Sequence, residues 1–283
     1  MVISSTEKPG TLKQPIRNST TKLALQINYI DIFSTIEQTL KKQSGLSDKL
    51  FTDKYSNFFN LTFSSRTDDE YFYLLKLIVF YSGFKAETVT NKIHIINKHL
   101  PDYKTISFFD DKNTAVILSD KEMIKNRSKI SATINNAKIF QNIVEKYGSF
   151  QKYLDSFEPK VSFEKLMLLK EELTYKFNYL GGITVYHFLT DIGLPVLKPD
   201  RVLTRIFERL GLIENEKQLL KTVIHGRKFA AETEKSIRYI DIIFVTYGQQ
   251  GPEGICLSKN PKCHLCGLSN QCNHFQQIIS KVS

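Results

Sequence analysis

The segment ICLSKNPKCHLCGLSNQC, residues 255–272, contains every cysteine of the 283-residue chain. Cys256, Cys263, Cys266 and Cys272 follow in C-x6-C-x2-C-x5-C spacing, and the residues between them are mostly polar or turn-forming. Such a segment cannot bury a core of its own, whereas a bound metal centre would give it a fixed structure. The four cysteines therefore indicate a metal-ligand set.

Three interpretations of these cysteines are disulfides, a zinc site and an iron–sulfur cluster. Disulfides need an oxidising compartment, and the opening segment MVISSTEKPGTLKQPIRNST lacks the apolar core of a signal peptide. Tetrahedral zinc suits a C-x2-C pair, but zinc ribbons usually carry two such pairs and only Cys263 and Cys266 form one here. A 4Fe-4S cluster also takes four thiolates. The spacing favours zinc and the iron–sulfur cluster equally.

The composition indicates a polyanion partner. The formal net charge is +10, and 41% of the residues are hydrophobic, which is enough for a core. A basic surface favours binding to nucleic acid in a salt-sensitive manner. No run of eighteen apolar residues is present, so we expect no membrane span. We expect a monomer in a bacterial-type cytoplasm, associated with the nucleoid.

Hydrophobic periodicity predicts an all-α fold. Apolar residues recur at helical spacing along most of the chain, and few segments alternate with a period of two. Pro101 is expected to stop one helix, and Gly148 to stand at the C-terminal cap of another. The polar segment 1–21 is predicted to be disordered. The predicted helices are 23–42, 71–81, 87–100, 128–147, 163–178, 185–192, 201–210 and 235–247.

Two features in the middle of the chain have both a structural and a functional interpretation. The stretch YLGGITVY, residues 179–186, is a Gly-Gly turn between two helices. It is either an ordinary turn or a device that presents backbone N–H groups to a phosphate. Asp200 precedes the next helix as an N-cap residue would. Its carboxylate is also placed to face a developing cation or to activate a water.

Together the hairpin, the aspartate and the cysteines resemble the helix-hairpin-helix (HhH-GPD) DNA glycosylase superfamily. The segment from Ile255 to Cys272, with Pro261 two residues before the second cysteine, resembles the 4Fe-4S loop of the endonuclease III family. The region 71–202 resembles 3-methyladenine DNA glycosylase I, through Ile124–Ala137 and Leu180–Phe188. The resemblance implies a two-domain architecture with a C-terminal iron–sulfur cluster loop. The expected segments are a disordered tail (1–21) and an N-terminal helix with its connecting segment that packs with the C-terminal domain (22–68). They are followed by a central helical domain with the hairpin (69–192, hairpin 179–186) and a C-terminal helical domain with the iron–sulfur loop (193–283, loop 256–272).

The resemblance also implies the site residues. Asp200 is the expected catalytic residue, and Tyr186, His187 and Glu87 are candidates for the base pocket. Double-stranded DNA would be contacted by the hairpin and by the cysteine loop, through Gly181, Gly182, Thr184, Lys259 and Lys262. A 4Fe-4S cluster, with zinc as the alternative, would be held by Cys256, Cys263, Cys266 and Cys272. Arg201, Arg205 and Arg209 recur every four residues and predict a basic stripe on one helix.

Departures from the resembled families shape the predicted activity. The position of the methyladenine enzymes' base-reading Glu falls at about Ile78, and that of their Trp at about Ala86, next to Glu87. The position of the Schiff-base lysine of bifunctional glycosylases falls near Tyr186. We therefore predict a monofunctional DNA glycosylase of base excision repair that acts on a damaged, preferentially alkylated base. The alternatives are a mismatch glycosylase for thymine or adenine, and a non-catalytic DNA-binding module with iron–sulfur or zinc.

Overall fold

The computed structural model describes residues 27–59 and 63–282 of the chain. Within these ranges it contains fifteen α-helices, three 3-10 helices and no strand, which confirms the predicted all-α class. The predicted disordered tail, residues 1–21, lies outside the described residues. No described helix is both long enough and apolar enough to span a membrane.

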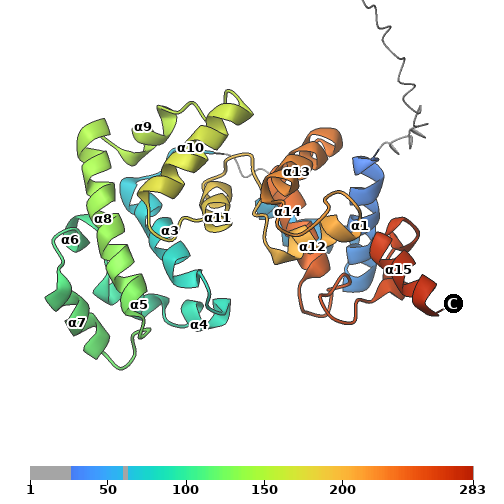
Figure 1. Ribbon diagram of the computed structural model, residues 1–283, viewed down its shortest axis with the longest axis horizontal. Helices are drawn as coiled ribbons and strands as arrows, with labels where there is room; N and C mark the ends of the chain where they lie inside the picture. The colour runs from blue at the N-terminus through green and yellow to red at the C-terminus, as the bar shows by residue number, and fades with distance from the viewer. Residues whose placement is uncertain (1–26, 60–62, 283) are drawn as a thin grey trace, which may run out of the picture.

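The helices pack in two lobes (Figure 1). We call the group α3–α11 the central lobe. The terminal lobe combines α1 and α2 with the helices after α11, and α1 packs directly against α13 and α14. The central lobe comprises α3 (Asp68–Tyr81), α4 (Ala86–Thr90), α5 (Ile93–His99), α6 (Tyr103–Ile106), α7 (Asp111–Ser119), α8 (Arg127–Tyr147), α9 (Phe150–Asp155), α10 (Phe163–Lys176) and α11 (Thr184–Asp191). The terminal lobe comprises α1 (Tyr29–Ser44), α2 (Asp48–Tyr55), η1 (Ser56–Phe58), α12 (Arg201–Arg209), α13 (Leu219–Thr233), α14 (Ile237–Gly248), η2 (Cys263–Leu265), η3 (Ser269–Gln271) and α15 (Asn273–Val282).

Each lobe is built around buried aromatic rings. In the central lobe, Phe140 of α8 and Phe150 of α9 stack with their ring centroids 4.4 Å apart. In the terminal lobe, Phe229 of α13 and Phe244 of α14 meet edge to face at 5.0 Å. Burying one such side chain contributes about 1.5–3 kcal/mol, so these rings are a principal source of each lobe's stability.

Capping residues set the ends of the long helices where the sequence predicts them. Gly148 ends α8 in the left-handed conformation, with φ 83°, as predicted. The predicted helix 87–100 is wrong in one respect, because it is two helices, α4 and α5, separated at Asn91 and Lys92. The β-branched run from Thr88 to Thr90 and the following asparagine both weaken a continuous helix.

The helix α13 is not among the predicted helices, and Gly226 stands in its middle. A Cβ at this position would lie 2.0 Å from Leu197 Cδ2. The glycine therefore allows α13 to pack closely on the segment 192–199, which we call the connector. This segment leads from α11 to Asp200, so the close contact helps to position the start of α12.

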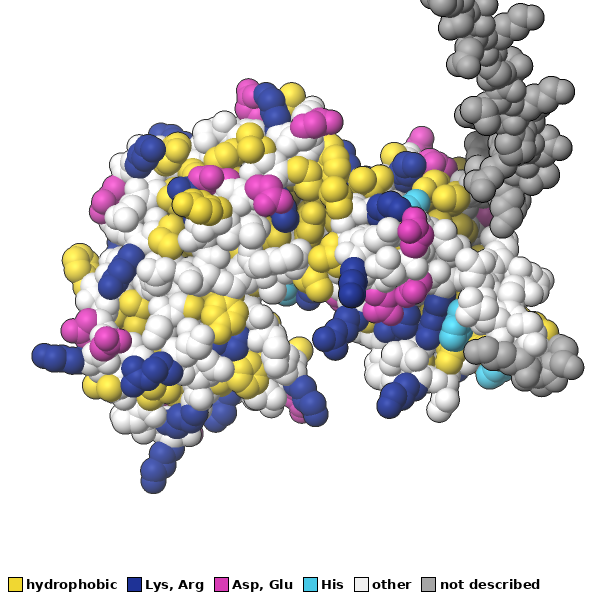
Figure 2. All heavy atoms as spheres, viewed as in Figure 1, with side chains coloured by type: hydrophobic (Ala, Val, Ile, Leu, Met, Phe, Trp, Pro, Cys, Tyr) yellow, Lys and Arg dark blue, Asp and Glu magenta, His cyan; other side chains and the backbone are white. Residues whose placement is uncertain are grey.

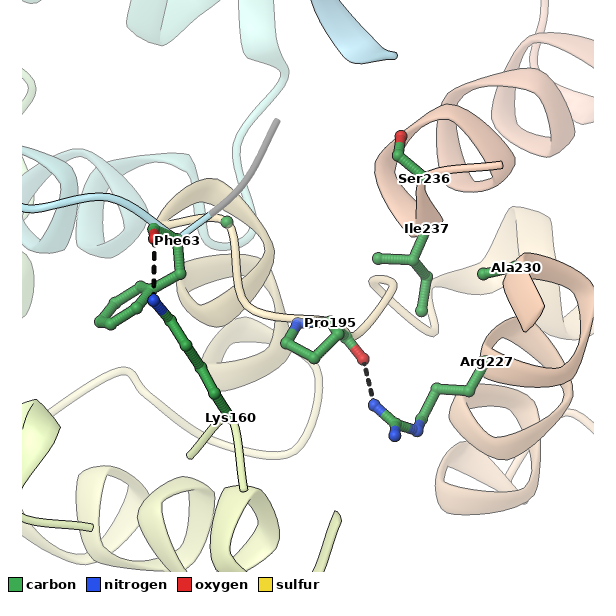
Figure 3. Close-up of a pocket in the computed structure, with 8 residues that line it drawn as sticks. Phe63, Lys160, Pro195, Arg227, Ala230, Ser236 and Ile237 are labelled. Atoms are coloured by element: carbon green, nitrogen blue, oxygen red, sulfur yellow. Dashed lines mark hydrogen bonds between the residues drawn. The ribbon is translucent and has the colours of Figure 1, made fainter. Parts of the chain in front are cut away.

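A pocket of 470 Å³ lies at the junction of the lobes (Figure 3). On its terminal-lobe side, Arg227 Nη1 donates a hydrogen bond to the carbonyl oxygen of Pro195 in the connector, at 2.8 Å. Lys160 Nζ donates to the carbonyl oxygen of Phe63 at 3.1 Å. None of the predicted site residues lines this pocket. The pocket is therefore separate from the predicted site residues.

Candidate active site

Asp200 is the N-cap of α12, as the sequence predicts. Its Oδ1 accepts hydrogen bonds from the backbone N–H groups of Val202 and Leu203, at 2.8 and 3.1 Å. Its Oδ2 accepts no hydrogen bond from any described residue, and the side chain is half-buried. One oxygen thus fixes the carboxylate to a rigid helix start, while the other remains available to a group outside the protein.

A second carboxylate, that of Asp241, lies close to Asp200. It belongs to α14, which packs against α12, and only 2% of the residue is exposed. Burial raises the pKa of the Asp241 carboxyl to about 6; the charge of Asp200 also raises it, while Arg238 and Lys198 lower it. Because the charge of Asp200 acts on Asp241, the two carboxylates belong to one electrostatic site.

Arg238 connects this site to the central lobe. Its Nη1 donates to Asp241 Oδ2 one turn along α14, and its Nη2 lies 3.8 Å from Asp191 Oδ1. Asp191 is the last residue of α11. One guanidinium is therefore shared by a carboxylate from each lobe. We call Asp191, Arg238 and Asp241 the junction network.

His187 joins the junction network from α11. Its Nε2 lies 3.2 Å from Asp191 Oδ2. Burial lowers the pKa of His187 to about 3, and the cations of Lys198 and Arg238 lower it further. The ring is therefore neutral at pH 7, so its contact with Asp191 is polar and not an ion pair. On the other side, Arg66 Nη2 donates to the Asp191 carbonyl oxygen at 3.0 Å.

The Gly-Gly hairpin is fastened to α8. Asn136 Nδ2 donates to the carbonyl oxygen of Asn178 at 3.0 Å, and Asn136 Oδ1 accepts from the Asn178 N–H at 2.8 Å. Tyr179, with φ 65°, is the residue of the hairpin with positive φ. Thr184 closes the turn, because its hydroxyl donates to the Tyr179 carbonyl oxygen at 2.5 Å.

The two glycines of the hairpin are exposed, and the fold itself does not require them. Neither has a positive φ. A Cβ at Gly181 would meet nothing within 4 Å, and one at Gly182 would only touch Leu219 Cδ1 at 3.5 Å. The backbone N–H groups of Gly181, Gly182 and Ile183 have no acceptor among the described residues. The start of α11 thus presents unpaired donors beside two residues without side chains, which suits a close-approaching anion.

The remaining predicted pocket residues lie in separate places. Tyr186 is buried in the central lobe, with its hydroxyl 3.8 Å from Met167 Sδ. Glu87 is exposed on the short helix α4, at the lower edge of the same lobe in Figure 1. The structure therefore brings His187, but not Tyr186 or Glu87, into the network beside Asp200. The roles of these three residues stay predictions.

The predicted arginine stripe on α12 points mainly at the cysteine loop. Arg205 Nη2 donates to the carbonyl oxygens of Gly248 and Cys256, at 2.7 and 3.2 Å. Arg209 Nη1 donates to the Leu257 carbonyl oxygen at 2.8 Å and to Cys256 Sγ at 3.2 Å. Only Arg201 is exposed. Two of the three arginines are thus occupied in holding the loop.

The two lysines of the cysteine loop differ in their surroundings. Lys259 is exposed and has no bonded partner among the described residues. Lys262 is half-buried, and its Nζ donates to the Pro252 carbonyl oxygen at 3.3 Å. Lys259 is therefore the more available of the two for a phosphate.

All four cysteines line the wall of one small cavity between α12, α15 and the loop. They form no disulfide. Tyr247 Oη donates to Cys266 Sγ at 2.9 Å, as Arg209 does to Cys256. Among the described residues, no group of three histidine, cysteine, aspartate or glutamate side chains has the arrangement of a metal-ion site. The donor set fits an iron–sulfur cluster chemically, because four thiols share one cavity and two of the sulfurs accept hydrogen bonds.

A family model decides which proteins this architecture is related to. Residues 49–174, from α2 to α10, match the model of the methyladenine glycosylase family. The chain thus has a region similar to the methyladenine glycosylase family, within a fold similar to that of endonuclease III. It is homologous to DNA glycosylases, which hydrolyse N-glycosyl bonds. The match ends before the hairpin and Asp200, so their roles in this glycosylase homologue are inferred from geometry.

Two solved structures of endonuclease III have a fold similar to that of this chain. A trapped covalent intermediate of endonuclease III with DNA is 16% identical, with a TM-score of 0.52, and the alignment covers 87% of this chain and 98% of that one. A non-covalent endonuclease III–DNA complex is 15% identical, with a TM-score of 0.50 and coverage of 88% and 98%. A mutant of 3-methyladenine DNA glycosylase I from Staphylococcus aureus is 21% identical over 54% of this chain and 90% of its own, with a TM-score of 0.42.

The sequence analysis missed the junction network of the glycosylase homologue. One signal was present in the stretch 237–247, IRYIDIIFVTY, where Asp241 is the one carboxylate in an otherwise apolar helix. Arg238 precedes it by three residues, which places the two side chains on one face. A buried carboxylate with an arginine one turn away is a recognisable candidate for a polar site. The partner Asp191 depends on the packing of the lobes and has no such signal.

Proposed function

We propose that the protein is a monofunctional DNA glycosylase, which hydrolyses the N-glycosidic bond of a damaged, preferentially alkylated base in duplex DNA. The observation that carries this proposal is the geometry of Asp200. Its Oδ1 is fixed by two backbone N–H groups, and its Oδ2 accepts no hydrogen bond from the described protein. A carboxylate held in this way is positioned in advance for a charge that develops only during the reaction.

In the reaction, the bond between the sugar C1′ and the base nitrogen breaks, and the electron pair leaves with the base. Positive charge develops on the sugar, and the free oxygen of Asp200 would stabilise it. A water oxygen then bonds to C1′ and releases one proton to Asp200 or to solvent. An alkylated base with a positive charge leaves as a neutral molecule, so the protein need not supply an acid. The proposed mechanism assigns no acid to the protein, and this supports an alkylated substrate.

Binding to DNA is supported by two surfaces. The hairpin presents the unpaired N–H groups of Gly181, Gly182 and Ile183 at the start of α11, where a backbone phosphate would accept them. Figure 2 shows a notch between the lobes with lysine and arginine side chains on both rims. A duplex lying along these rims would have to turn the target base outward, because the glycosidic bond is not accessible within the stack.

Ile78 bears on which base the protein would recognise. The position of the base-reading Glu in the resembled methyladenine enzymes falls at about this residue, and only 2% of Ile78 is exposed. An aliphatic side chain at that place offers no carboxylate to a base edge. We therefore propose an alkylated base as the substrate class, without the 3-methyladenine recognition of those enzymes. A mismatched thymine or adenine is the alternative that a substrate panel would reveal.

The cysteine loop is proposed to hold a 4Fe-4S cluster through Cys256, Cys263, Cys266 and Cys272. When bound, the cluster would supply four fixed bonds that order the loop. Lys259 on the loop would then lie at a defined place for a phosphate contact. Arg209 would neutralise part of the negative charge on Cys256. No step of base removal is assigned to the cluster.

Strand cleavage is not part of the proposed activity. The position of the Schiff-base lysine falls near Tyr186, whose hydroxyl is buried against Met167, so this residue offers no amine to an abasic site. Lys198, two residues before Asp200, is the nearest amine in sequence. Incubation with abasic duplex and borohydride tests this point. Absence of a trapped complex is expected, and a complex that disappears in Lys198→Met would show that the enzyme is bifunctional.

The proposed function is tested by base release from a panel of duplexes. The panel contains methylated DNA, uracil, an 8-oxoguanine–adenine pair and a guanine–thymine pair, and abasic sites are detected by alkaline cleavage. Release from methylated DNA that is lost in Asp200→Asn is the expected result. Release only from a mismatch would change the substrate class. Tight binding without release from any duplex would support a non-catalytic DNA-binding module.

A further inference from the structure

We propose that Arg238 is a positioning residue for the reaction at Asp200. This inference rests on the proposed function of Asp200. Arg238 does not touch Asp200 in the described structure. It acts by holding Asp191 of the central lobe and Asp241 of the terminal lobe in one fixed arrangement.

The position of the connector explains why such a residue is needed. The segment 192–199 is not helical, and it separates the end of α11 from Asp200 at the start of α12. The hairpin that is proposed to bind phosphate lies at the other end of α11. The distance between the phosphate anchor and the carboxylate therefore depends on the connector keeping its shape.

Arg238 holds the near end of the connector directly and acts on the far end through α14. Its Nη2 lies 3.8 Å from Asp191 Oδ1, directly before the connector, and its Nη1 is hydrogen-bonded to Asp241 of α14, the helix that packs against α12. The guanidinium also lies over the ring of Phe58, 5.7 Å from its centroid. Three elements, α11, α14 and η1, thus meet at one side chain, of which only 20% is exposed.

The chemistry of the guanidinium suits this task better than that of an ammonium. Arginine presents several N–H donors in a planar fork, which can serve two carboxylates at once. Lysine supplies the same charge from a single nitrogen and cannot hold both partners in the same geometry. Without any cation at this position, Asp241 would be left as an unpaired buried carboxylate next to Asp200, and such charges are strongly unfavourable.

The test compares the wild-type protein with Arg238→Met, Arg238→Lys and Arg227→Met. Arg227 is the matched control, because it also braces the connector, through Pro195, but contacts neither Asp191 nor Asp241 (Figure 3). Single-turnover base release and DNA affinity are measured at one salt concentration. We expect Arg238→Met to slow release about 10- to 100-fold, the effect of a misplacement on the order of 1 Å. DNA affinity should change less than about threefold, since no DNA contact is removed.

The variants separate positioning from general stability. Arg238→Lys should recover part of the lost rate. Arg227→Met should unfold more easily but slow release less than about threefold, because Arg227 holds the middle of the connector and neither Asp191 nor Asp241. Equal rates for Arg238→Met and Arg227→Met would overturn the inference. If the wild-type protein releases no base, the proposed function fails, and hydrogen exchange decides the inference alone. The amides of Val202 and Leu203, which Asp200 caps, should exchange faster in Arg238→Met than in Arg227→Met. Identical exchange would contradict a positioning role.

Discussion

The side chain of Asn136 satisfies both backbone groups of Asn178. Its Nδ2 donates to the carbonyl oxygen at 3.0 Å, and its Oδ1 accepts from the N–H at 2.8 Å. Asn136 is buried in α8, and Asn178 lies directly before the Gly-Gly turn. The hairpin is therefore fixed to the longest helix of the central lobe by a two-way hydrogen bond, independently of anything that the hairpin binds.

Replacing Asn136 by alanine should destabilise the protein and loosen the hairpin. The substitution removes two hydrogen bonds to the backbone of Asn178, and each such bond contributes about 0.5–1.5 kcal/mol. Urea unfolding measures the loss in the free energy of unfolding. Asn135→Ala is the matched control, because its neighbour Asn135 is exposed and should change stability by less than about 0.5 kcal/mol. Equal losses in both variants would contradict the account of the hairpin.

Gly181→Ala should separate the stability of the hairpin from its binding of DNA. A Cβ at this position meets nothing in the protein, and its φ is not positive. Alanine should therefore leave stability unchanged or raise it by about 0.4–1 kcal/mol. If a phosphate approaches the backbone here, the added methyl group should weaken duplex binding. Unchanged affinity for a short duplex, measured at fixed salt, would remove Gly181 from the DNA interface.

Arg209→Met should impair retention of the metal centre. The guanidinium donates to Cys256 Sγ and to the Leu257 carbonyl oxygen, so its loss removes a charge-assisted bond to a ligand sulfur. Wild-type protein made without oxygen should be yellow-brown, and the variant should contain less iron per chain. Arg201→Met is the control on the same helix, because Arg201 is exposed. A colourless wild-type protein with stoichiometric zinc would contradict the iron–sulfur proposal.

Asp241 should make stability depend on pH in a defined direction. Burial raises the pKa of this carboxyl from 3.8 to about 6, so the folded state binds the proton more tightly than the unfolded chain. The contribution is present below pH 4 and is lost as pH rises to about 6. Asn at this position cannot titrate. The free energy of unfolding of wild type relative to Asp241→Asn should therefore fall by on the order of 3 kcal/mol between pH 4 and pH 7. A constant difference would show that Asp241 is not perturbed.

Much of the fold could be predicted because apolar periodicity and caps are local signals. Thr67 and Glu70 form a capping box that starts α3 three residues before the predicted boundary at Tyr71, which shows the usual imprecision of helix ends. The long helix α13 is not among the predicted helices, and Gly226 in its middle is a weak helix former. A glycine is needed at position 226 because of a tertiary contact, the close approach of Leu197.

In the candidate site too, local features could be predicted from the sequence and contacts between distant segments could not. Asp200 could be predicted as a cap, since its position before an amphipathic helix is visible in the sequence. The stripe of Arg205 and Arg209 was visible too, but its direction depends on where the cysteine loop folds back. The pairing of Arg238 with Asp191 required two lobes to meet, and no local pattern encodes such a meeting.

The most direct test of the proposed function is the single-turnover rate of base release from methylated duplex by wild-type protein and by Asp200→Asn. Asparagine is as good an N-cap residue as aspartate, so helix α12 should stay folded while the charge is removed. We predict that wild-type protein releases the base and that the variant is slower by about 100-fold or more, with similar DNA affinity. Equal rates in the two proteins would contradict a catalytic role for Asp200.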